Sequence, residues 1–165
     1  MATPTNLPAS FSSGAVLTAT QQNDLRGAFR VLQVVTATYS TYTTHNSTTY
    51  TDTGLTASIT PQATTNKILV TVFNNGCVRG AENSGNALSL QLLRGATQIQ
   101  QVKDWGGTST TLLQQGTVHI QVLDSPASIS ALTYKMQGKN AIATSTVGTQ
   151  FGSTTSTIVL MEISA

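Results

Sequence analysis

The stretch that decides the fold lies at residues 118–124 and reads Val-His-Ile-Gln-Val-Leu-Asp. Apolar and polar side chains alternate along its first five residues, and residues 55–60 and 88–92 show the same alternation. A period of two residues is typical of a half-buried β-strand that keeps one face in solvent. Threonine occupies several of the polar positions, and its branched Cβ suits a pleated strand. The chain is therefore expected to be a β protein.

Three other runs, at residues 31–35, 68–73 and 158–163, are more continuously apolar. Such runs indicate strands that are covered on both faces. Turn-forming residues separate the expected strands, and Arg94-Gly95-Ala96 predicts a hairpin. The other predicted turns are Asn74-Asn75-Gly76, Ser84-Gly85-Asn86, Asp124-Ser125-Pro126 and Gly138-Lys139-Asn140.

About eight strands with short connections predict an antiparallel β-sandwich of the jelly-roll type over residues 30–165. Residues 1–29 are expected to form a separate extended arm, ending in one short helix at residues 18–29. Prolines bias the start of the arm away from helix, and a free arm is ordered only when a partner binds it. The residues expected to dock this arm on a partner are Pro4, Leu7, Pro8, Phe11, Val16 and Leu17.

The composition is rich in hydroxyls and poor in charge. Threonine and serine make up 46 of the 165 residues, and only 8% of the residues are charged, for a net charge of +2. A nucleic-acid-binding surface needs a dense basic patch, so nucleic acid is not an expected partner. No apolar run approaches the length of a membrane-spanning helix, and the first residues lack the pattern of a secretory signal. We therefore expect synthesis in a cytoplasm and no membrane insertion.

Nothing in the sequence predicts an active site, a metal site or a cofactor. Cys77 is the only cysteine, so it is expected to be a small buried residue, and the two histidines form no Cys/His cluster. The six carboxylates include no close sequence pair, and no nucleophile elbow or phosphate-binding loop is present. We expect His119 at a surface or an interface, and the protein is not expected to be an enzyme.

Two features predict contacts with a receptor or glycan. The loop at residues 39–50 contains Tyr39, Tyr42, His45 and Tyr50, and binding loops favour tyrosine because it gives contact area at low entropic cost. Trp105 stands beside two glycines and could stack on a sugar ring. The alternative is that the tyrosines pack on the sandwich, that His45 faces solvent, and that Trp105 belongs to the core or a subunit interface.

Several segments in order resemble a run of strands in virion proteins of tailed bacteriophages. These segments are Tyr50-Thr-Asp-Thr-Gly-Leu-Thr-Ala-Ser-Ile-Thr-Pro61, Lys67-Ile-Leu-Val70, Val118-His-Ile-Gln-Val-Leu-Asp-Ser-Pro126, Leu132-Thr-Tyr-Lys-Met-Gln137 and Ser156-Thr-Ile-Val-Leu-Met-Glu-Ile163. The resemblance covers about residues 30–163. It implies a jelly roll similar to the tumour-necrosis-factor head, in a tail-fibre, minor tail or head-decoration protein.

What the resemblance implies is a homotrimer held in a phage virion through its N-terminal arm. The first expectation is a minor tail or tail-fibre protein whose loops face the host surface and contact a glycan or an envelope protein. The sequence lacks the collagen-like or coiled-coil shaft of long fibres, which keeps a capsid decoration protein open as an alternative. A carbohydrate-binding module and a depolymerase enzyme are the remaining alternatives, and the latter would need clustered carboxylates.

Overall fold

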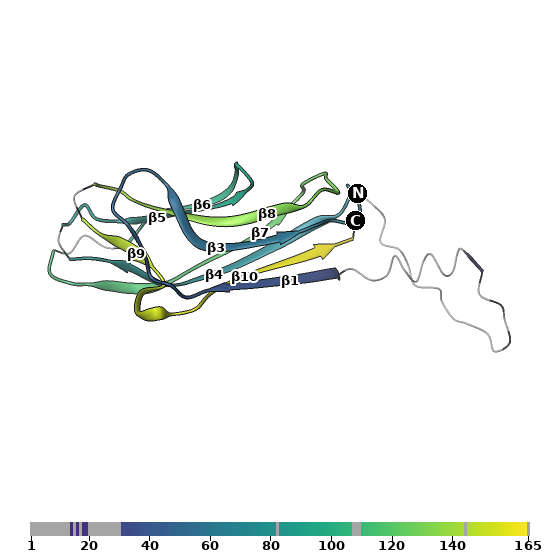
Figure 1. The fold of residues 1–165 in the computed structure, drawn as a ribbon, viewed down its shortest axis with the longest axis horizontal. Coiled ribbons are helices and arrows are strands. Elements are labelled where there is room, and N and C mark those ends of the chain that lie inside the picture. The colour runs from purple at the N-terminus through teal and green to yellow at the C-terminus, as the bar shows by residue number, and fades with distance from the viewer. Residues whose placement is uncertain are drawn as a thin grey trace.

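The structure is a computed structural model, and it describes residues 14, 16, 18, 19, 31–81, 83–106, 110–143 and 145–164. The described chain folds into two antiparallel β-sheets packed face to face (Figure 1). Sheet A contains, in order, β1 (Val31–Tyr39), β10 (Ser156–Ile163), β4 (Lys67–Arg79), β9 (Val147–Thr149) and β2 (Thr43–His45), with β7 (Gln114–Asp124) also paired to β4. Sheet B contains, in order, β3 (Thr51–Ile59), β8 (Leu132–Asn140), β5 (Leu88–Arg94) and β6 (Thr97–Trp105).

The strand pairing is that of a jelly roll. The eight long strands form nested antiparallel pairs, in which β1 pairs with β10, β3 with β8, β4 with β7, and β5 with β6. The predicted all-β sandwich is therefore confirmed. Strands β2 and β9 are short additions of three residues each at one end of sheet A.

The alternation seen in the sequence builds the core between the sheets. Inward-facing residues of both sheets form one cluster with almost no solvent exposure, whose members include Leu55, Ile68, Val70, Val72, Leu88, Leu90, Leu92, Ile120, Tyr134, Met136, Ile158 and Leu160. Fully burying an aliphatic side chain contributes about 1.5–3 kcal/mol, so this cluster is the main stabilising element. Cys77 joins the cluster, as expected.

The turns were predicted with mixed success. Gly95 and Ala96 form the expected two-residue turn between β5 and β6, and β7 ends at Asp124. The turns expected at Asn74–Gly76 and Gly138–Asn140 are wrong, because β4 and β8 run straight through them. At Gly76 the register of β4 against β7 shifts, so the turn-forming residues produce a bulge inside a strand.

The expected helix at residues 18–29 and most of the expected arm lie outside the described residues. Pro4, Leu7, Pro8, Phe11 and Leu17 belong to that part, whereas Val16 is described and is exposed. Within the described part of the chain, the one helical turn longer than a single residue is a 3-10 turn, η1 (Phe151–Ser153), between β9 and β10.

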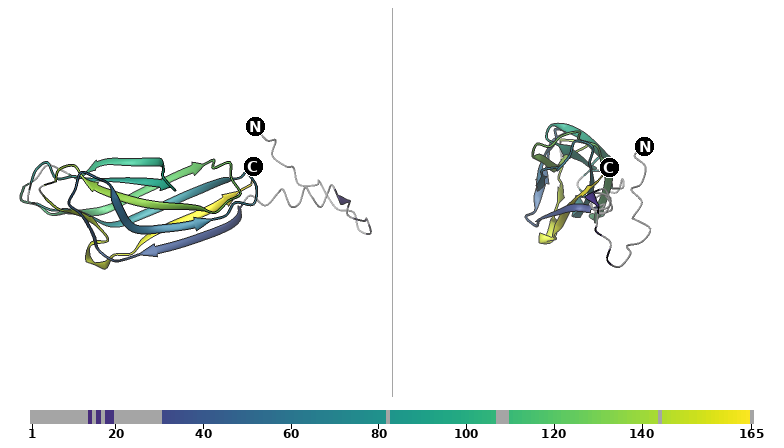
Figure 2. Two further views of the ribbon diagram at one scale, coloured as in Figure 1. Left: turned by 45° about the horizontal axis from the view of Figure 1, so that its top comes forward. Right: turned by 90° about the vertical axis from the view of Figure 1, so that its right-hand side faces the viewer.

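The sandwich is elongated and has two distinct ends (Figure 2). We call the end at which β1 begins and β10 ends the base, since Val31 and Ile163 are register partners there. The opposite, distal end carries the connections that follow β4, β6 and β8. Residues 1–30 therefore join the sandwich at its base.

Candidate functional site

A row of apolar side chains crosses the outer face of sheet A near the base. Val34 of β1 lies beside Met161 of β10, Met161 beside Leu69 of β4, and Leu69 beside Leu123 of β7. Their sequence neighbours point inward to the core, so alternation directs these four side chains outward. Val34 and Leu123 are 54% and 51% exposed. We call these four residues the apolar row.

The apolar character continues along the same face toward the distal end. Val159 of β10 lies beside Thr71 of β4, and Phe73 lies beside His119 of β7. The rings of Phe73 and His119 stack with centroids 4.6 Å apart and planes 14° from parallel, and Phe73 is 44% exposed. His119 therefore lies on a surface, as expected. Aromatic surface of this kind is common in protein interfaces.

The outer face of sheet B has the opposite chemistry. Asp52 of β3 binds the Lys135 ammonium at 3.0 Å and accepts a hydrogen bond of 2.7 Å from the Gln137 amide. The Gln91 amide of β5 joins this group of side chains by donating a hydrogen bond of 2.8 Å to the Gln137 side-chain oxygen. Burial alone would raise the pKa of Asp52, but the hydrogen bonds from Gln137 and Lys135 and the charge of Lys135 lower it overall. Polar side chains on this face thus satisfy one another across three strands.

This contrast distinguishes the two faces of the sandwich. The outer face of sheet B is hydrogen-bonded and charged, as a solvent-facing sheet should be. Along the four long strands of sheet A, among the described residues, Lys67 is the only Lys, Arg, Asp or Glu at an outward position. We expected both faces to be covered at residues 31–35, 68–73 and 158–163. For a single chain this expectation is wrong, because no layer of the described chain covers the outer face of sheet A.

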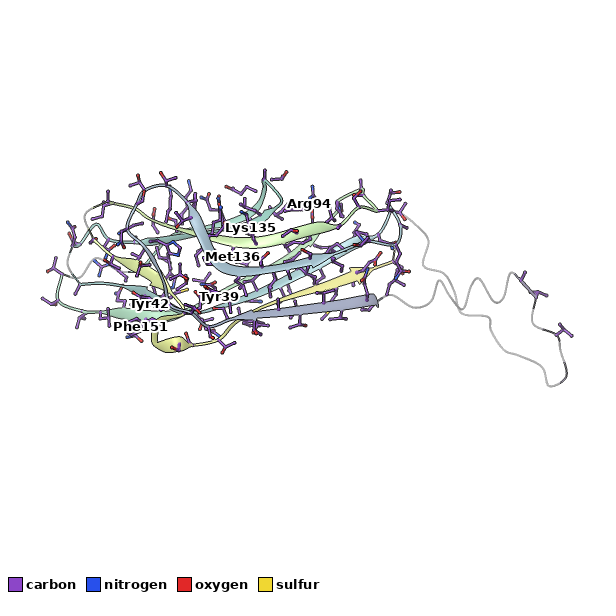
Figure 3. The ribbon with its side chains drawn as sticks, viewed as in Figure 1. Tyr39, Tyr42, Arg94, Lys135, Met136 and Phe151 are labelled. Carbon is purple, nitrogen blue, oxygen red and sulfur yellow. The ribbon has the colours of Figure 1, made fainter. Side chains whose placement is uncertain are left out.

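The predicted contact residues do not form one site. Tyr39 packs its ring against Gly54, where any Cβ would lie 2.3 Å from the ring and φ is +88°. The Tyr50 hydroxyl accepts a hydrogen bond from Gln101, and Trp105 is half-buried against the core. Tyr42 is 40% exposed and meets Phe151 edge-on, with centroids 5.3 Å apart (Figure 3). Of these aromatic residues, Tyr42 is the one on an open surface.

His45 lies inside the protein, so the expectation that it faces solvent is wrong. It ends the short strand β2, is 2% exposed, and its Nδ1 lies 2.8 Å from the Thr51 hydroxyl. Its Nε2 has no hydrogen-bond partner among the described residues and lies against Gly138, where a Cβ would be only 2.6 Å away. Burial lowers the pKa of His45 to about 4 from its usual 6.5.

Acid should therefore destabilise the protein through His45. The unfolded chain binds a proton near pH 6.5 and the folded chain only near pH 4, so the contribution of neutral His45 is complete above pH 6.5 and is lost as the pH falls toward 4. By linkage, this difference between the unfolded and folded pKa values of His45 corresponds to about 3 kcal/mol of unfolding free energy. Denaturant titrations at pH 7 and pH 4.5 should show a larger loss in the wild type than in His45→Gln. The variant His119→Gln, which retains His45, should behave as the wild type; equal losses in all three proteins would contradict this assignment.

The described carboxylates lie on four different strands and have separate partners. Asp124 of β7 binds Arg94 and the Tyr134 hydroxyl, each at 2.6 Å. Glu162 of β10 accepts from Gln33, Gln62 and Asn66, while Asp104 of β6 accepts from the Ser89 hydroxyl. In the part of the chain that the structure describes, no group of three or more His, Cys, Asp or Glu is placed to hold a metal ion.

Comparison with protein-family models found no family that matches this sequence, and no curated protein matches it at a significant level. Among the described residues, no helix has the length and apolarity needed to cross a membrane. Strand register and side-chain exposure together make the outer face of sheet A the strongest candidate for a functional surface.

Proposed function

We propose that this protein is a non-enzymatic structural component of a phage virion, and that it assembles as a homotrimer through the outer face of sheet A. The observation that carries the proposal is the apolar row of Val34, Met161, Leu69 and Leu123, which crosses four strands of an uncovered sheet. The phage assignment and the number of copies come from the sequence resemblance described above.

Covering this face has a physical reason. Exposed apolar surface is unfavourable in water at roughly 25 cal/mol per Å², so a patch that spans several strands favours association. The strands of sheet A are also more continuously apolar than those of a sheet with one solvent-exposed face. A second copy of the chain supplies an apolar surface of the same kind, and the near absence of charge on the face leaves no repulsion between like copies.

The position of the base fits attachment through the N-terminal segment. Residues 1–30 enter the sandwich at the base, and the connections after β4, β6 and β8 lie at the opposite end. A trimer anchored through this segment would present its distal loops away from the particle. This orientation supports the role of a minor tail or tail-fibre protein with loops toward the host surface.

The virion role is tested by deleting residues 1–16. The shortened protein is expected to remain a folded trimer, because the core and the apolar row lie entirely within residues 31–163, but it should not join the particle. Incorporation is measured by mass spectrometry of purified particles grown with the full and shortened chains. Normal incorporation of the shortened chain would contradict a docking role for the arm.

A capsid decoration protein is the second candidate, because the sequence resemblance includes head-decoration proteins as well as tail proteins. The two roles differ in the number of copies. A tail component occurs a few times per particle, whereas a decoration protein covers the head in many copies. Quantitative mass spectrometry against the major capsid protein distinguishes them, and absence of the chain from purified particles would contradict both.

A further inference from the structure

A hollow opens on the outer face of sheet A toward its distal end, beyond the Phe73–His119 pair. It has a volume of about 370 Å³ and lies between β7 and the η1 turn, over the bulge in β4. Glycines 76 and 116 form part of its wall. The other described residues that line it are Asn75, Gln115, Thr117, Phe151 and Thr154.

The backbone around this hollow is held in an unusual conformation. Gly76 has φ +61°, and a Cβ there would lie 2.1 Å from the Thr154 hydroxyl. Gln150 and Ser153 of the adjacent turn are not glycines, yet they have φ values of 58° and 59°. Such residues cost on the order of 1–3 kcal/mol each, so the surrounding contacts must hold the turn firmly in place.

Hydrogen bonds to Asn75 fix the turn against the bulge. The Gln150 N–H donates to the Asn75 carbonyl at 3.0 Å, and the Asn75 amide donates to the Thr155 carbonyl at 2.7 Å. The Thr117 hydroxyl in turn donates to the Asn75 side-chain oxygen at 2.9 Å. The hollow is therefore preformed, which lowers the entropic cost of binding a ligand.

The lining combines uncharged polar groups with an aromatic ring. Residues with amide or hydroxyl side chains, Asn75, Gln115, Thr117 and Thr154, surround the hollow, and none of the described residues that line it is charged. A charged ligand would lose hydration there without gaining a partner. Phe151 also lines the hollow, and its ring meets Tyr42 edge-on (Figure 3).

We propose that this hollow binds a neutral saccharide. A sugar ring presents hydroxyls at its edge, which the Gln115 amide and the acceptor lone pairs of the Thr117 and Thr154 hydroxyls can pair, and C–H groups on its face, which can pack on an aromatic ring. The hollow lies in the distal half of the face and the apolar row lies near the base, so binding does not require the site to be shared with the trimer contact. This inference does not rest on the virion role.

The experiment is an NMR titration of the isotope-labelled full chain with glucose, galactose, mannose and N-acetylglucosamine, each to about 50 mM, a range suited to the millimolar affinities of single sugars. At least one neutral sugar should shift the amide signals of Gly76 and Gly116 and saturate. N-acetylneuraminic acid, which is charged, should not.

Two variants locate the site and one serves as a control. Gln115 is exposed at the rim, so Gln115→Ala should keep the fold and weaken binding at least about fivefold. Phe151→Leu keeps an apolar side chain but removes the ring, and should weaken binding by a similar factor. Gln121→Ala, on the same strand as Gln115 but outside the hollow, should bind as the wild type.

Three results would overturn the proposal. One is the absence of saturable shifts with all four neutral sugars. Another is a set of shifts of equal size elsewhere on the protein or with glycerol, which means an adventitious polyol only. The third is unchanged binding in both Gln115→Ala and Phe151→Leu. The oligomeric state measured on the same sample is a separate readout, so failure of sugar binding is distinguishable from failure of trimer formation.

Discussion

Replacing Leu69 by lysine is expected to convert the proposed trimer into folded monomers. Leu69 is central in the apolar row, with Met161 on one side and Leu123 on the other. In the trimer a lysine there would bring an unpaired charge into an apolar contact in each subunit, at a cost of several kcal/mol each, roughly. A cost of about 3 kcal/mol already weakens association more than 100-fold. In the monomer the lysine reaches water, so the fold survives.

The measurement is sedimentation velocity combined with circular dichroism at equal protein concentration. Ser58→Lys is the matched control, because Ser58 is an exposed strand residue on the outer face of sheet B. It should remain trimeric. Should Leu69→Lys fail to fold, Leu123→Lys at the edge strand β7 tests the same contact, since Leu123 is 51% exposed. A trimer that persists in both folded variants would place the interface elsewhere.

Truncating Glu162 is expected to cause a large loss of stability. Its buried carboxylate accepts hydrogen bonds from the Gln33 amide at 2.6 Å, the Gln62 N–H at 2.7 Å and the Asn66 amide at 2.5 Å. It thereby ties β10 to β1 and to the connection between β3 and β4. Charge-assisted hydrogen bonds contribute about 1.5–3 kcal/mol each, and Glu162→Ala would leave these donors without their acceptor. We expect a loss of about 3–5 kcal/mol.

The hydrogen bonds also explain why Glu162 stays ionised. Burial alone would raise its pKa. The hydrogen bonds that Asn66, Gln33 and Gln62 donate together have the larger effect, and they lower the pKa below its usual value. The stability that ionised Glu162 contributes is thus fully present above the pKa that this carboxyl has in the unfolded chain. It is lost as the pH falls through the lower pKa of the folded protein. Glu162→Gln keeps one acceptor oxygen without the charge, so its loss should be intermediate.

Urea denaturation followed by Trp105 fluorescence measures these changes at pH 7. Asp104→Asn is the control, because Asp104 is an exposed carboxylate that accepts a hydrogen bond from the Ser89 hydroxyl. It should change the unfolding free energy by less than about 1 kcal/mol. A change equally small in Glu162→Ala would contradict the role assigned to Glu162.

The strands of the fold could be predicted because their signal is local. Alternation at residues 55–60, 88–92 and 118–122 reports directly which side chains face the core, and the turn at Gly95 needs only its own residues. The turn expected at Gly76 was wrong because the same turn-forming residues also make a bulge when a partner strand continues beside them. The partner strand β7 lies some forty residues later in the sequence, so the residues around Gly76 do not reveal it.

The candidate sites could be predicted only in part, because they depend on distant segments. His45 is buried because Gly138 leaves room for its ring, and nothing near His45 in the sequence indicates this. The hollow joins Asn75, Gln115 and Phe151, which come together only in the folded sheet. The continuous apolar runs indicated strands with two covered faces, but they could not tell that the described chain itself leaves one of these faces uncovered.

The mass of the full chain in solution tests the central claim most directly. Sedimentation equilibrium at tens of micromolar protein is expected to give about 52 kDa, three times the 17.3 kDa of one chain. A single species of 17.3 kDa over that concentration range would mean that the outer face of sheet A stays uncovered, and it would contradict the proposed assembly.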